Sequence, residues 1–389
     1  MGVARRLIVR TSSDDLTRYI QQYSSGWHWK PLAHLGEKDG LFLVELPDQF
    51  SMRQVIETSQ NLNEMDWVRY AQPDLFFSHQ LARGKPVYQM NSFSLADDIH
   101  LPFAWNFTLG ESVSVAIIDD GFRLQHKSWE GVNIVPTFNS AAPSHPGADH
   151  GGLVAGVIFA HKYKNGNHGV APEADFVPIQ MAGGWSSQII HAILQAIAAG
   201  ADIINISWTL QYTTQPVQDV IEYYYYHGNE EKGVVFVAAA GNRDRHNHDD
   251  TEALANLPWV ISVGFVDHAN TVLVGDYGVK VDIAAPTMLP TPSPKSAEDF
   301  VRIAGSSGAA PVVSGVLALM ASIDPTLTSQ ELRTLLIGTA DPLLHDTTCC
   351  NVSTRFPYGL VNAEQAVSSV LAQRSDKKKS GYRPTGEVD

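Results

Sequence analysis

The sequence predicts an α/β protein in which a small α+β domain precedes a doubly wound, mainly parallel sheet. Apolar runs of strand type, such as 113–118, 202–206 and 234–240, alternate with helical segments at intervals of about 30 residues. This pattern is typical of a parallel sheet covered on both faces. The first 80 residues alternate strand and helix patterns at shorter intervals. With 389 residues and a hydrophobic fraction of 44%, the chain can build one large and one small core.

The N-terminal segment, residues 1–80, is expected to fold as a βαββαβ unit. Its strands are expected at 6–10, 27–35, 40–46 and 67–71, and its helices at 14–23 and 51–62. This order of elements is that of a ferredoxin-like α+β domain. A linker over 81–97 is expected to join it to the larger domain, residues 98–372.

Three segments of the larger domain carry residue types suited to nucleophilic catalysis. The apolar run 113–118 ends at Asp119 and Asp120, and the carboxyl ends of parallel strands are where such sheets place their sites. His150 opens a small-residue helix, and Ser307 stands at the start of an apolar one. A serine hydroxyl is a weak nucleophile unless an imidazole takes its proton and a carboxylate orients that imidazole. The chain offers all three groups, in the order Asp, His, Ser.

These segments resemble the motifs of the subtilisin-like serine protease family. Asp119-Asp120-Gly121 is similar to the family's Asp-Ser/Thr-Gly, 150–156 to its His-Gly-Thr-His-Val-Ala-Gly, and 305–311 to its Gly-Thr-Ser-Met-Ala-Ala-Pro. The resemblance implies a subtilisin-like fold and a serine endopeptidase that works through an acyl-enzyme. It implies Ser307 as nucleophile, His150 as general base and Asp119 as the carboxylate that orients the imidazole. Asp120, at the second motif position, is expected to be dispensable.

The resemblance also implies an oxyanion site and a substrate site. Asn242, which follows the strand-like run 234–240, matches the asparagine whose amide donates to the oxyanion together with the backbone N–H of Ser307. The implied substrate-binding residues are Ser207, Trp208, Thr209, Ala240 and Gly241. Thr209 and Leu210 stand where the family usually has two glycines, which predicts a narrower pocket wall. The charged segment 243–250 either contacts a charged substrate side chain or forms a solvated loop.

Placed before such a domain, the N-terminal unit resembles the family's inhibitory propeptide. The resemblance implies that its sheet packs on the two helices that flank the substrate-binding strands, and that a tail over 75–80 passes through the active site. We therefore expect an intramolecular inhibitor that is removed by self-cleavage between Phe76 and Tyr88, near Gln80. An independent α/β module with no inhibitory role is the alternative.

Composition limits the partners of this chain. The net charge of −14 argues against broad nucleic-acid affinity, and the absence of an 18-residue apolar run argues against a membrane span. No leader-like segment opens the sequence, which predicts a cytoplasmic protein, or a secreted one if a leader precedes residue 1 in nature. The basic and polar segment 373–389 is expected to be a disordered tail. The adjacent cysteines Cys349 and Cys350 cannot link distant segments.

No metal or cofactor is expected. The segment 161–168 matches the loop with which many relatives bind calcium, but it contains no carboxylate. His246 and His248, followed by two aspartates, are typical of a polar loop rather than of a metal site. The expected partners are a peptide or protein substrate and the chain's own propeptide. Two alternatives stay open: a protease dedicated to one precursor, and a catalytically silent binding protein on the same fold.

Overall fold

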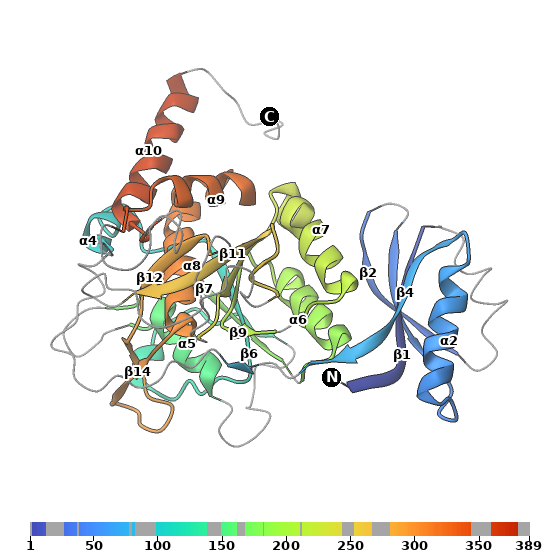
Figure 1. Ribbon diagram of the computed structural model, residues 1–389. Coiled ribbons are helices and arrows are strands. Elements are labelled where there is room, and N and C mark those ends of the chain that lie inside the picture. The colour runs from blue at the N-terminus through green and yellow to red at the C-terminus, as the bar shows by residue number, and fades with distance from the viewer. Residues whose placement is uncertain are drawn as a thin grey trace, which may run out of the picture.

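The computed structural model (Figure 1) describes residues 2–12, 27–36, 39–77, 80–81, 99–137, 149–161, 168–181, 183–210, 212–242, 253–266, 281–343 and 359–379. A larger domain lies beside a smaller N-terminal domain. Helices α6 (Ser186–Ala198) and α7 (Gln215–Glu231) stand between the sheets of the two domains (Figure 1).

A six-stranded sheet forms the centre of the larger domain, and every neighbouring pair of its strands is parallel. Its order is β12-β11-β10-β8-β6-β7. The strands are β6 (Ser114–Asp119), β7 (Asp175–Gln180), β8 (Ile203–Ile206), β10 (Val235–Ala239), β11 (Val260–Val266) and β12 (Ile283–Pro286). The predicted fold class is confirmed. The order reverses at β6, so the carboxyl end of that strand lies where such sheets bind their ligands.

Helices cover both faces of this sheet because its strands are apolar on both sides. In β6, Val115 and Ile117 pack into one core and Ala116 and Ile118 into the other. The first core includes α5 (His150–Phe159), α8 (Ser306–Ile323), α9 (Ser329–Gly338) and α10 (Ala363–Lys379). The second core includes α6 and α7.

Helix α8 runs through the centre of the larger domain. By length and composition alone it could cross a membrane, but 94% of it is buried inside the protein. Its apolar sequence is therefore explained by its place in the core. The remaining short elements are α4 (Leu101–Ala104), the 3₁₀ turn η1 (Lys127–Trp129), and strands β5 (Gln80–Leu81), β9 (Trp208–Thr209), β13 (Leu289–Pro292) and β14 (Phe300–Ile303).

The N-terminal domain is an antiparallel sheet of order β2-β3-β1-β4. It contains β1 (Gly2–Thr11), β2 (His28–His34), β3 (Gly40–Glu45), α2 (Met52–Asn63) and β4 (Val68–Phe76). The four predicted strands and the second predicted helix are confirmed, whereas the helix expected at 14–23 lies outside the described residues. Leu7 and Val9 pack in a core with α2, and Ile8, between them, faces the core that contains α6 and α7.

The C-terminal segment corrects one expectation. Residues 373–379, which were expected to belong to a disordered tail, continue α10 as far as Lys379. The Arg374 guanidinium donates to the carbonyl of Ile323 at 2.9 Å, and the Lys377 ammonium lies 3.5 Å from the Asp324 carboxylate. Ala, Gln, Lys and Arg are good helix formers, and these contacts at the end of α8 anchor the last turns. Residues 380–389 lie outside the described part of the chain.

Candidate active site

Asp119 and His150 form a buried pair at the carboxyl end of the central sheet. Asp119 is the last residue of β6, and His150 is the first residue of α5. Nδ1 of the imidazole lies 2.9 Å from Oδ1 and 3.0 Å from Oδ2 of the carboxylate. Both side chains are almost wholly buried: the exposed fraction is 1% for His150 and 0% for Asp119. The carboxylate therefore holds the imidazole in the tautomer that carries its proton on Nδ1.

The glycine after His150 allows this close approach. A Cβ on Gly151 would lie 2.8 Å from both the Cβ of Asp119 and the carbonyl oxygen of Gly121. Any larger residue would push the start of α5 away from the end of β6. The small residues of this motif thus set the distance between the imidazole and the carboxylate.

Ser307 lies in the first turn of α8 and is fully buried. Its hydroxyl donates to the backbone carbonyl of Ser207 at 2.9 Å. Nε2 of His150 is buried and has no hydrogen-bond partner among the described residues. The hydroxyl of the predicted nucleophile is therefore bonded to the carbonyl of Ser207, and no hydrogen bond joins it to His150 in the structure.

Asn242 follows β10, and its side chain amide is held at one end only. Its Oδ1 accepts from the backbone N–H of Ser306 at 2.9 Å and from the Ser306 hydroxyl at 3.1 Å. Its Nδ2 is buried and has no partner among the described residues. A Cβ on Gly305, whose φ is +73°, would lie within 2.9 Å of this amide. Ser306 and Gly305 thus leave a donor free near the nucleophile turn, as an oxyanion site requires.

Asn242→Ala is expected to lower kcat by about 10²–10³-fold, because one oxyanion donor is lost while the nucleophile and its base remain. KM should change little, since the donor acts on the transition state rather than on the bound substrate. Steady-state kinetics on a cleaved peptide measure both constants. Equal losses in Asn242→Ala and in a variant without the nucleophile would contradict this assignment.

Asp120 is a second buried carboxyl beside the pair. Its Oδ1 accepts from the backbone N–H of His150 at 3.0 Å, so it holds the start of α5. Burial, together with the neighbouring carboxylate of Asp119, raises the pKa of Asp120 to about 6. The structure supports the choice of Asp119 as the partner of the imidazole, because Asp120 contacts His150 through the backbone.

The raised pKa of Asp120 predicts a pH-dependent stability. Between the ordinary carboxyl pKa and about 6, the folded state binds more protons than the unfolded state, so ionisation destabilises the fold as the pH rises. In the Ser307→Ala protein, Asp120→Asn should therefore raise the melting temperature more at about pH 7.5 than at about pH 4. A difference in melting temperature that is independent of pH would contradict the shift.

Asp120→Ser should retain activity within about tenfold, because a hydroxyl also accepts from the His150 N–H.

The predicted substrate strand is β9, and it is paired. Gln80 lies opposite Thr209 and Leu81 opposite Trp208 in the antiparallel pair of β5 and β9. The side chain of Trp208 does not face this ladder: it is 1% exposed, and its indole N–H donates to the carbonyl of Ile118 at 2.7 Å. Only the backbone of Trp208 is therefore placed to pair with an extended segment, and its indole instead joins β9 to β6, next to Asp119.

The other predicted pocket residues are buried near the nucleophile turn. Leu210 is 1% exposed and belongs to the core that contains α6 and α7. Ala240 donates to the carbonyl of Val263 at 3.0 Å, and Gly241 donates to the Ser306 hydroxyl at 3.2 Å. The charged segment 243–250, with its two histidines, lies outside the described residues.

Two residues that the sequence analysis missed line the path of the N-terminal chain. Gly184 accepts from the backbone N–H of Phe77 at 2.9 Å, and a Cβ at this glycine would lie 1.9 Å from the Phe77 carbonyl oxygen. Trp185 packs edge-on against Phe76, with ring centroids 5.2 Å apart. The adjacent glycines 183 and 184 before a helix are a signal of close backbone approach that could have indicated this contact.

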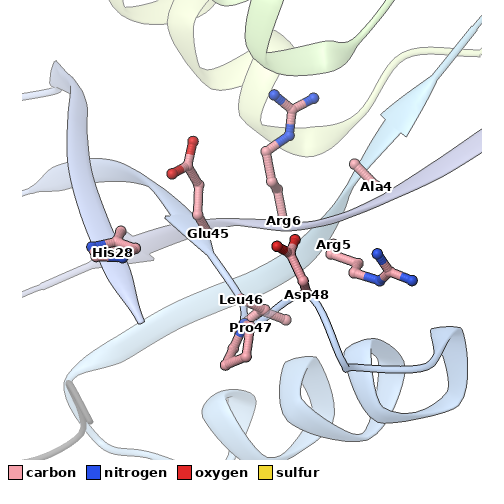
Figure 2. Close-up of a pocket in the computed structure, with 8 residues that line it drawn as sticks. All are labelled: Ala4, Arg5, Arg6, His28, Glu45, Leu46, Pro47 and Asp48. Carbon is pink, nitrogen blue, oxygen red and sulfur yellow. The ribbon is translucent and has the colours of Figure 1, made fainter. Parts of the chain in front are cut away.

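The described residues contain no candidate metal cluster, and the pocket of Figure 2 lies away from this site. No group of three or more His, Cys, Asp or Glu residues with metal-binding geometry occurs in the described ranges. The expectation that segment 161–168 lacks calcium ligands stays a prediction, because residues 162–167 lie outside the described ranges. The pocket in Figure 2 lies on the N-terminal domain, where Arg5, Arg6 and His28 meet Glu45 and Asp48. Its charges are mixed, and it contains none of the predicted catalytic residues.

Comparison with known proteins identifies relatives of this chain. Residues 110–369 match the subtilase family. A thermophilic serine proteinase from Bacillus sp. (strain AK1) is 28% identical over 317 residues, covering 79% of this chain and 74% of the relative. Subtilisin from Bacillus pumilus is 30% identical over 266 residues, covering 66% of this chain and 91% of the relative.

A solved structure shows the same fold. Fervidolysin from Fervidobacterium pennivorans, described as a keratinolytic enzyme related to subtilisin, superposes with a TM-score of 0.68 at 21% sequence identity. The superposition covers 93% of this chain but 60% of the fervidolysin chain. Because it covers nearly the whole of this chain, the similarity extends beyond the residues that match the family.

Proposed function

This chain belongs to the subtilase family of serine endopeptidases, and we propose that Asp119, His150 and Ser307 are its catalytic triad. The observation that carries this assignment is the buried Asp119–His150 pair, whose outer nitrogen Nε2 has no partner among the described residues. To activate a serine nucleophile, an imidazole must be oriented through one ring nitrogen and must have the other nitrogen free to accept the serine proton.

In the proposed reaction each of these groups has one task. The Ser307 hydroxyl turns from the Ser207 carbonyl toward Nε2 of His150, gives up its proton there and attacks the peptide carbonyl carbon. The oxyanion is held by Nδ2 of Asn242 and the backbone N–H of Ser307. His150 then returns the proton to the leaving amine as the C–N bond breaks. Water, activated by the same imidazole, hydrolyses the acyl-enzyme and restores Ser307, while Asp119 stabilises the imidazolium in each step.

The N-terminal domain is proposed to be an intramolecular inhibitor. Its last strand leads to Phe76 and Phe77, which pass along Gly184 and Trp185, and the chain then pairs with β9 at Gln80 and Leu81. An antiparallel segment on β9 takes the backbone groups that an extended substrate would use. Access of other peptides to the triad therefore depends on removal of this segment.

Charged contacts support a specific interface between the two domains. Asp74, which is 0% exposed, accepts from the backbone N–H and the hydroxyl of Ser187 in the first turn of α6, and it pairs with Arg6 at 2.8 Å. A carboxylate at the start of a helix is stabilised by the unpaired N–H groups there. On α7, Asp219 binds Arg10 at 2.7 Å. These contacts fix the sheet on the helices that flank β9.

Incubation of the purified protein with a diverse peptide library, with the cuts mapped by mass spectrometry, tests the proposed activity. A fluorophosphonate probe should label the protein at Ser307 after the N-terminal segment has left β9. If no peptide is cut and Ser307 is not labelled, even after the N-terminal domain has been removed by limited proteolysis, the chain is a catalytically silent member of the family.

A further inference from the structure

A chain of buried polar groups runs from the middle of α8 to the backbone of Ser307. The Ser314 hydroxyl donates to Oδ1 of Asn205 at 2.9 Å, and Nδ2 of Asn205 donates to the Ser207 hydroxyl at 3.0 Å. The Ser207 hydroxyl in turn donates to the backbone carbonyl of Ser307 at 3.1 Å. All four residues have an exposed fraction of 0%. Loss of any one bond would therefore leave a buried polar atom unpaired.

Asn205 fixes which group donates and which accepts along this series of hydrogen bonds. Its amide nitrogen can only donate, so the Ser207 oxygen is the acceptor of that bond. The single hydrogen of the Ser207 hydroxyl is then directed to the carbonyl of Ser307. The Ser314 hydroxyl also lies 3.2 Å from the carbonyl of Ala310, so it can pair with either end of the amide. The orientation in the structure is the one that leaves the Ser207 hydrogen for the carbonyl of Ser307.

Pro311 explains why the carbonyl of Ser307 needs this donor. In an α-helix a carbonyl accepts from the N–H four residues later, and the residue four positions after Ser307 is Pro311, which has no N–H. The proline ring also crowds the carbonyl four residues before it. The Ser207 hydroxyl thus occupies the place of the missing helix donor.

We propose that the hydroxyl of Ser207, oriented by Asn205, is a positioning group for the nucleophile. The inference rests on the proposed function of Ser307. The two serines are joined at two points, because the hydroxyl of Ser307 also donates to the carbonyl of Ser207. The bond from Ser207 holds the backbone that carries both the attacking oxygen and the oxyanion N–H. The Ser207 hydroxyl acts through the backbone of Ser307. Its removal would leave the backbone of β9 unchanged.

The test compares the wild type, Ser207→Ala, Pro311→Ala and the double variant. Each is produced as the full chain and is assayed after limited proteolysis has removed its N-terminal domain. Ser207→Ala is expected to lower kcat and the rate of fluorophosphonate labelling by about tenfold, the effect of losing one positioning bond, with KM within about twofold. Pro311→Ala supplies an N–H four residues after Ser307. The double variant should therefore recover a large part of the loss, so that the two substitutions are not additive.

Ser329→Ala is the matched control, because it removes another buried hydroxyl, 2% exposed, that donates to a distant backbone carbonyl, that of Tyr225. It should lower the melting temperature but not kcat. The proposal is overturned if Ser207→Ala keeps a kcat within twofold of wild type, or if Ser329→Ala lowers kcat as much as Ser207→Ala does. It is also overturned if Pro311→Ala changes kcat by the same factor in the wild type and in the Ser207→Ala protein. A wild type that neither cuts peptides nor reacts with the probe would instead reject the proposed function.

Discussion

Ser307→Ala is expected to abolish almost all peptide hydrolysis, with kcat lower by about 10⁶-fold. The attacking oxygen is lost, and only the oxyanion site and substrate binding remain. His150→Ala should have an effect of the same size, and Asp119→Asn should cost about 10⁴-fold, because the amide keeps the shape of the carboxylate but no longer holds the right tautomer. Turnover of a peptide identified from the library measures each loss.

Two comparisons make this prediction specific. Ser307→Ala combined with His150→Ala should be no slower than Ser307→Ala alone, because the groups act as a unit. Ser306→Ala should cost no more than Asn242→Ala, since the Ser306 hydroxyl orients the amide of Asn242 and does not attack the substrate. If Ser306→Ala were as inactive as Ser307→Ala, the nucleophile would have been assigned to the wrong serine.

The sequence predicted the parts of the fold that depend on local pattern. Apolar runs such as Val113 to Ile118 admit little besides a strand buried on both faces, and βαββαβ alternation places four strands in one small sheet. The carboxylate and the imidazole could be paired because each ends or begins an element at the same edge of a parallel sheet. The role of Gly151 was not predicted: it is the structure that shows how this glycine allows the close approach between them.

Contacts between distant segments could not be predicted in the same way. Asp74 binds Ser187 across 113 positions of the chain, and nothing in the sequence near either residue marks the pair. The sequence pattern also does not predict the direction in which a side chain points at the end of a strand. Trp208 follows Ser207 in a segment read as a pocket wall, yet its indole is turned toward the carbonyl of Ile118, which supplies an acceptor that only the fold brings near.

The wild-type protein is expected to cut its own chain once, near Gln80, within the interval 76–88 predicted from the sequence. In the pair of β5 and β9, Gln80 lies opposite Thr209 and Leu81 opposite Trp208. The residue before β9 is Ser207, whose carbonyl binds the Ser307 hydroxyl, so the segment paired with β9 lies next to the nucleophile. A tethered segment has a high effective concentration, so even a poor sequence is cut there. Mass spectrometry of the purified wild type should show this cut, and Ser307→Ala should remain full length.

The released fragment, residues 1–80, should inhibit the mature enzyme when it is added back, and Asp74 should account for much of its affinity. Asp74→Ala leaves Arg6 and the first turn of α6 without a buried partner, which should raise the inhibition constant by about 30-fold or more. Glu57→Ala is the control, because that carboxylate is half-exposed and pairs with Arg53 on α2. Processing of isolated Ser307→Ala at the wild-type rate, or full activity of the uncut protein, would show that the N-terminal domain serves folding or a partner rather than inhibition.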